Sequence, residues 1–89
     1  MKFVWSEAKR LRNLEQHGFD FADAAQVFAG LTFTYVDDRF AYAEQRLVTL
    51  GLLNEIVVSI VHTESVQVIR VISMRRATRR EQAIFFSSI

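Results

Sequence analysis

The sequence predicts an α+β fold with a small, mostly antiparallel four-stranded sheet, an N-terminal helical hairpin and a C-terminal helix. In the first third of the chain, apolar residues recur at helical spacing between capping residues. The middle alternates in the manner of strands joined by short connections, and a helix-start signal follows the last strand. With 89 residues, 51% of them apolar, and no proline, we expect one domain over residues 1–89.

The N-terminal elements are a candidate edge strand and two helices. Phe3 to Trp5 form a short apolar start that could add an edge strand. Ser6 is a suitable N-cap and Gly18 a suitable C-terminal cap for a helix over residues 7–17. Asp20 is expected to cap a second, shorter helix, which completes the hairpin.

The first helix has two contrasting sides. A three-residue spacing predicts that its buried side consists of Ala8, Leu11 and Leu14. The opposite side, which we expect to be solvated, carries Lys9, Asn13 and His17.

The sheet and the final helix follow from the second half of the chain. Alternating apolar residues predict strands over residues 31–36, 44–52, 54–63 and 66–74. The last two strands are apolar on both faces, so we expect them to be central. Thr78 and Glu81 have the spacing of a capping box and predict a helix over residues 79–86.

A cationic segment, Arg70 to Glu81, stands out against a nearly neutral chain. It contains five arginines and one acid, whereas the net charge of the whole chain is +1. Such a cluster favours an anionic partner. There are no cysteines, no histidine pair at metal-ligand spacing and no run of membrane-spanning length. We therefore expect no metal, no cofactor and no membrane contact, and a cytoplasmic protein.

The arginines of this segment have structural and functional interpretations. Arg79 and Arg80 stand at the positive end of a helix, where they are either solvated or converge with the helix N-terminus on a phosphate. Neighbours in an extended chain point in opposite directions, so one of Arg75 and Arg76 is expected to face the same site. Arg70 lies in a strand and needs either an ion-pair partner, for which Glu44 is a candidate, or a substrate phosphate.

The two histidines and the tryptophan are less informative. His62 is in a strand and is interpreted as a structural residue, with catalysis as the alternative. His17 has a simple explanation as a cation at a helix C-terminus, but it could also act as a base. Trp5 is expected to pack against the core or an edge, although an exposed tryptophan can stack on a base.

A spaced pattern of residues runs along nearly the whole chain. It consists of Trp5, Lys9, Asn13, His17-Gly18, Phe21, Ala24, Val27-Phe28, Glu44-x-Arg46, Gly51 and the run from Ile69 to Glu81. This pattern resembles the BrnT family of bacterial type II toxins. The arginine-rich run is its most specific part. Ser6 replaces the Asp that often follows the tryptophan in that family, and Ala43 replaces its common Gly.

The resemblance implies a RelE-like ribonuclease fold, with helices on one side of a small sheet and an open RNA-binding surface on the other. It implies a toxin that cleaves RNA as an endoribonuclease and inhibits translation. It also implies a BrnA-like antitoxin with a DNA-binding domain, which would cover the toxin in a hetero-oligomer.

RNA cleavage needs no metal when the 2′-hydroxyl is the nucleophile, provided that a base, cations and an acid are present. The expected catalytic residues are Arg70, Arg75, Arg76, Glu44 and His17, with the last two as unranked candidate bases. The expected RNA-binding residues are Lys9, Arg79, Arg80 and Trp5. The alternative function is a non-catalytic, arginine-rich binding module for a DNA-binding antitoxin-like partner or for nucleic acid.

Overall fold

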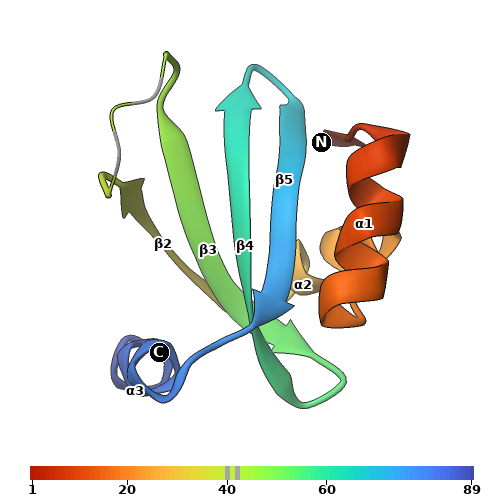
Figure 1. The fold of residues 1–89 in the computed structure, drawn as a ribbon. Coiled ribbons are helices and arrows are strands. Elements are labelled where there is room, and N and C mark those ends of the chain that lie inside the picture. Colours follow the sequence, from red (N-terminus) through yellow and green to blue (C-terminus); the bar gives the residue numbers. More distant parts are fainter. Residues whose placement is uncertain (40, 42) are drawn as a thin grey trace.

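The fold is built on a five-stranded mixed sheet (Figure 1). The computed structural model describes residues 1–39, 41 and 43–89. The strands within these residues are β1 (Lys2–Val4), β2 (Thr32–Asp37), β3 (Arg46–Leu53), β4 (Ile56–Ser65) and β5 (Val68–Arg76). Their order is β1-β5-β4-β3-β2, with β2 to β5 antiparallel and β1 parallel to β5. The predicted α+β class is confirmed, and the candidate N-terminal strand adds a fifth strand at the edge.

The strands begin and end one or two residues later than the sequence predicted, because the turns lie elsewhere. The sequence pattern predicts a strand at Asn54 and Glu55, but both have positive φ angles, of 48° and 70°, and form the turn between β3 and β4. The next turn lies at Val66 and Gln67, where Gln67 has a φ of 64°. Two-residue hairpin turns favour such left-handed conformations because these match the twist of the strands.

The helices are α1 (Glu7–His17), the 3₁₀ helix η1 (Phe21–Asp23), α2 (Ala24–Phe28) and α3 (Arg79–Ser87). The predicted start and end of α1 are confirmed: Ser6 caps its N-terminus, and Gly18 adopts a φ of 75° at its C-terminus. Asp20 caps η1, as expected for the second helical segment. Helix α1 packs against β5 and α2 against β3, so the two arms of the hairpin are held by the sheet.

The prediction for the two sides of α1 is wrong. Asn13 is buried, whereas Leu11 is 55% exposed. The reason is the position of α1 beside β5, beyond the point where β1 ends (Figure 1). Asn13 bonds both backbone groups of Met74, donating to its oxygen at 2.7 Å and accepting from its nitrogen at 3.1 Å. Its amide therefore pairs with β5 as a neighbouring strand would.

Two apolar clusters lie on opposite faces of the sheet. We call the face that packs against η1 and α2 the helix face; its cluster includes Phe21, Val27, Ile60 and Met74. The other face carries a smaller cluster beneath α3, which contains Val48, Leu50, Val57, Ala77 and Phe85. Helix α3 covers only the end of this face where β5 terminates (Figure 1). The rest of this face, with Thr63 and Arg70, is accessible. We call the whole face opposite the helix face the open face.

Candidate active site on the open face

A β-bulge in β5 determines which arginines share the open face. Val61 of β4 pairs with Ser73, but the next residue, His62, pairs with Val71. Ile72 is therefore an extra residue in β5, without a partner in this register. Each bulge of this kind shifts the alternation of side chains in the bulged strand by one.

The bulge puts Arg70 and Arg75 on one face and Arg76 on the other. Arg70 pairs with Thr63 and Arg75 with Ser59, and these β4 residues lie on the same side of their strand. Arg76 pairs with Val58, whose side chain is in the core of the helix face. Without the bulge, strict alternation would put Arg70 and Arg76 on one face. The expectation that the two adjacent arginines point in opposite directions is confirmed, and the one on the open face is Arg75.

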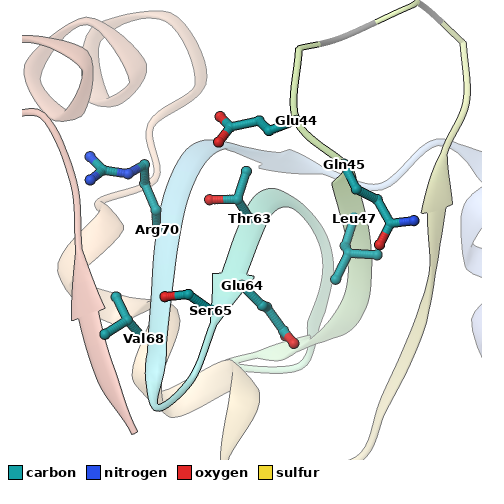
Figure 2. A pocket seen from close by; sticks show the side chains of 8 residues that line it. All are labelled: Glu44, Gln45, Leu47, Thr63, Glu64, Ser65, Val68 and Arg70. Carbon is teal, nitrogen blue, oxygen red and sulfur yellow. The ribbon is translucent and has the colours of Figure 1, made fainter.

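Arg70 and Glu44 line the same hollow at the edge of the open face (Figure 2). Its volume is about 480 Å³, and its lining residues are Glu44, Gln45, Leu47, Thr63, Glu64, Ser65, Val68 and Arg70. Arg70 and Glu44 are both exposed, and neither makes an ion pair or hydrogen bond with any described residue. The predicted alternative of a structural Arg70–Glu44 ion pair is therefore not present. Both charges are available to a ligand.

The hydroxyl groups in this hollow were missed by the sequence reasoning. Thr63 and Ser65 project from β4 next to Arg70, whereas the side chain of Glu64 points away from them (Figure 2). Thr63 and Ser65 stand two positions apart, which places both on one face of a strand, and this spacing was the available signal. Together the hollow combines a guanidinium, a carboxylate and two hydroxyls.

His17 and Lys9 belong to a second hollow, between α1 and β5. It is lined by Lys9, Arg12, Asn13, Gln16, His17, Ile72 and Ser73. Ser73 lies two pairs further along β5 than Arg70, so the two hollows are neighbours along this strand. The structure thus brings Glu44 to Arg70 and His17 to Lys9, and it separates the two candidate bases.

Arg75 is committed to a carboxylate at the start of α3. Its guanidinium donates to both oxygens of Glu81, at 2.8 and 3.0 Å. The predicted capping box is confirmed: Glu81 also accepts from the Thr78 nitrogen at 2.8 Å, and the Thr78 hydroxyl accepts from the Glu81 nitrogen. Burial alone would raise the pKa of Glu81, but the hydrogen bonds from Arg75 and Thr78 outweigh it and lower that pKa.

This arrangement bears on the idea that a phosphate binds at the N-terminus of α3. The carboxylate of Glu81 already occupies the position that such an anion would take. Arg79 and Arg80 are both exposed, but only Arg80 lines the hollow between α3 and β2. The structure therefore divides the cationic segment into separate places and does not bring its arginines together on one phosphate.

Trp5 and His62 occupy packed positions. Trp5 is half-buried and meets the ring of Phe21 edge-on, with the centroids 6.5 Å apart. His62 is fully buried; its Nε2 lies 2.7 Å from the Thr49 hydroxyl, and its Nδ1 is 3.7 Å from Glu64, beyond hydrogen-bond length. Burial lowers the pKa of His62 to about 4. It is therefore a neutral core residue on the helix face, as the structural interpretation predicted.

Comparison with known proteins adds one result. A family model described as the ribonuclease toxin BrnT of type II toxin-antitoxin systems matches residues 5–81. The chain belongs to the BrnT family. No curated protein matches it. The matched segment includes every candidate site residue, from Trp5 to Glu81, so all of them lie in the BrnT domain.

Membership in the BrnT family identifies a ribonuclease toxin, which acts on RNA and has an antitoxin as its partner. The described residues contain no group of three or more His, Cys, Asp or Glu side chains that could hold a metal ion. None of the helices formed by residues 1–39, 41 and 43–89 is long and apolar enough to cross a membrane.

Proposed function

We propose that this BrnT protein is a metal-independent endoribonuclease that cleaves RNA and thereby inhibits translation, with Arg70 and Glu44 at its reaction centre. One observation carries this proposal: the two side chains line the same hollow, and no described residue neutralises either of them. Attack by a 2′-hydroxyl needs above all a base and a cation, and a carboxylate beside a guanidinium supplies both.

In the proposed reaction, Glu44 accepts the proton of the 2′-hydroxyl as its oxygen attacks the adjacent phosphorus. The bond from phosphorus to the 5′-oxygen breaks, and that oxygen takes a proton from solvent water. The products are a 2′,3′-cyclic phosphate and a 5′-hydroxyl, and the proton that Glu44 accepted returns to the solvent, so the protons balance. Arg70 remains charged throughout and stabilises the negative charge that develops on the phosphoryl oxygens.

His17 is the second candidate base, and its position makes it testable separately. It lies with Lys9 in the hollow between α1 and β5, whereas Glu44 shares a hollow with Arg70. This grouping favours Glu44 as the base and gives Lys9 and His17 a role in holding the RNA next to the reaction centre. Glu44→Gln should then reduce kcat, whereas His17→Asn should act mainly on KM.

The partner that we propose is a BrnA-like antitoxin with a DNA-binding domain, in a hetero-oligomer with the toxin in the cytoplasm. An acidic segment of this partner suits the exposed guanidinium of Arg70, because carboxylates bind arginine through two parallel hydrogen bonds. Such a segment would inhibit by taking the place of the RNA phosphate.

The decisive experiment incubates a defined RNA with the protein in excess chelator, comparing wild type with Arg70→Ala. We expect cleavage by the wild type and a loss of roughly 10²–10³-fold in kcat for the variant, the usual effect of removing one group that stabilises developing charge. Arg76→Ala is the matched control, because it removes the same charge from the other face of the same strand. It should retain most of the activity.

Two results would decide against the proposal. Folded wild-type protein that leaves RNA intact under varied conditions, yet still binds it, would indicate the non-catalytic binding module. Equal losses for Arg70→Ala and Arg76→Ala would show that bulk charge matters and the hollow does not. In cells, expression of the toxin alone should arrest growth, and coexpression of the antitoxin should restore it.

A further inference from the structure

Another hollow on the open face, distinct from those of Arg70 and His17, has the chemistry of a nucleobase site. It lies between β2 and α3, has a volume of about 470 Å³, and shares no lining residue with the hollow of Arg70. This volume is within the roughly 300–1,000 Å³ of ordinary small-molecule sites. Its lining combines Phe33, Tyr35 and Ile84 with Arg39, Arg80 and Glu81. We call it the Tyr35 pocket.

The apolar wall of the Tyr35 pocket is a pair of aromatic rings. Phe33 and Tyr35 alternate along β2, so both point to the open face, and their ring centroids are 6.0 Å apart. Both rings are half-buried against the cluster beneath α3, which holds them in place while leaving part of each accessible. Burial raises the pKa of Tyr35, and the nearby carboxylate of Glu81 adds to this, so its phenol stays protonated and can donate a hydrogen bond.

The charges around the pocket leave one cation for a ligand. Glu81 is taken up by Arg75 and the Thr78 backbone, and Arg39 is held by the buried carboxylate of Asp37 at 2.8 and 3.0 Å. Arg80 is exposed and has no ion pair with any residue that the structure describes. A phosphate next to the aromatic wall would therefore find Arg80 unoccupied.

A buried hydroxyl supplies an independent sign of a ligand. Ser59 lines a smaller, adjoining hollow that shares Tyr35, Arg39 and Glu81 with the Tyr35 pocket and also includes the carboxylate of Asp38. Ser59 is only 1% exposed, and its Oγ has no hydrogen-bond partner among the described residues. Buried hydroxyls are nearly always bonded, so this one is available to a partner from outside the residues that the structure describes.

The hollow of Arg70 and the hollow that adjoins the Tyr35 pocket follow one another along β4. Thr63 lines the hollow of Arg70, and the next residues on the same side of the strand, Val61 and Ser59, line the adjoining hollow. Four residues of a strand span roughly 13 Å. A single RNA strand that passes Arg70 can therefore continue over β4 and reach the Tyr35 pocket with a nucleotide beyond the cleaved one.

We propose that the Tyr35 pocket binds one unpaired base of the RNA, which stacks on Tyr35 while a neighbouring phosphate contacts Arg80. The inference rests on the proposed RNA cleavage and assigns it a base-binding subsite away from the scissile phosphate. Stacking on an aromatic side chain and contact with a cation are the two elements by which proteins hold single strands. The carboxylates of an acidic peptide would engage Arg80 alone, whereas a base and its phosphate would use both Arg80 and the aromatic wall.

The test measures binding of a short single-stranded RNA whose riboses all carry 2′-O-methyl groups. This probe lacks the nucleophile, so its binding is independent of cleavage. Tyr35→Leu should weaken binding roughly 5- to 150-fold, the range for the loss of one base stack, and Tyr35→Phe should restore most of it. Abasic replacement at successive positions of the RNA should find one position, away from the scissile nucleotide, with a comparable loss.

Arg80 is tested through the salt dependence of binding, with Arg79→Ala as the matched variant. Arg80→Ala should reduce the slope of log affinity against log salt by about 0.7, the value for one phosphate contact on a single strand. Arg79→Ala removes the same charge from the same helical turn outside the pocket, and it should change the slope less. Both residues are exposed, so neither variant endangers folding.

The possible outcomes separate this inference from the proposed function. Suppose that wild type cleaves RNA, but Tyr35→Leu binds the probe as tightly as wild type, every abasic position has the same effect, and Arg79→Ala and Arg80→Ala change the salt slope equally. The Tyr35 pocket is then not a base site. If wild type cleaves nothing, the proposed function fails, while a Tyr35-dependent abasic position would still support the subsite. Binding of an acidic peptide that depends on Tyr35, when binding of the RNA probe does not, would also overturn the inference.

Discussion

The amide of Asn13 is expected to contribute strongly to the stability of this protein. It lies on α1, is 6% exposed, and makes three hydrogen bonds: to the oxygens of Met74 and Phe19, at 2.7 and 3.0 Å, and from the nitrogen of Met74, at 3.1 Å. Asn13→Ala would leave the backbone groups of Met74 without these bonds. Each unsatisfied buried group costs about 1–3 kcal/mol, so we expect the two groups together to cost about 2–6 kcal/mol.

This loss is large against the whole stability of a small domain, which is about 5–15 kcal/mol. Urea denaturation followed by circular dichroism would measure it as a lower midpoint with an unchanged slope. Asn13→Asp keeps the acceptor but sets a carboxylate against two carbonyl oxygens, so it should destabilise at least as much as alanine. Leu11→Ala is the control on the same helix; its exposed side chain predicts a change of less than about 1 kcal/mol. A larger loss for Leu11→Ala than for Asn13→Ala would refute the reasoning.

Two further predictions concern the helix face of the sheet. His62 has a pKa of about 4 in the folded protein against about 6.5 when unfolded, so the unfolded chain binds the proton first as the pH falls. The free energy of unfolding should therefore decrease by about 2 kcal/mol between pH 7 and pH 5, as measured by urea titrations at both pH values. His62→Gln should flatten this dependence on pH. An equally steep dependence in that variant would rule out His62 as the cause. Gly51 leaves room for α2, because an added Cβ would lie 2.6 Å from Cγ1 of Val27. Gly51→Ala should cost about 1–3 kcal/mol in thermal or urea unfolding, and Val27→Ala should relieve the clash; a neutral Gly51→Ala would mean that α2 shifts freely on β3.

Local patterns in the sequence were sufficient for the elements and their caps. Ser6 and Gly18 delimit α1 as predicted, and Thr78 and Glu81 form the predicted capping box. Such signals act over three or four residues, through hydrogen bonds to nearby backbone groups, so they can be read without knowing the fold. The cationic segment and its family resemblance could likewise be recognised from the chain alone, and the match to the family model confirms that resemblance.

Other features required the assembled sheet. The apolar spacing on α1 predicted the wrong buried side. The helix lies along the edge of β5 that faces away from β4, beyond the end of β1, and the backbone groups at this edge need hydrogen bonds more than apolar contacts. The grouping of Glu44 with Arg70 joins residues 26 positions apart in the sequence, and no local pattern distinguishes it from the alternative with His17.

The sequence by itself determined that this protein has helix, sheet and helix in this order, and that its arginines gather near the end of β5. Only the tertiary structure decided what each arginine does. The extra residue Ile72 turns Arg75, and not Arg76, to the side of Arg70. The carboxylate of Glu81 then engages Arg75, which leaves Arg70 and Arg80 exposed in separate hollows. The physical reason is that a side chain's direction depends on strand register, which pairing with β4 sets and local sequence does not.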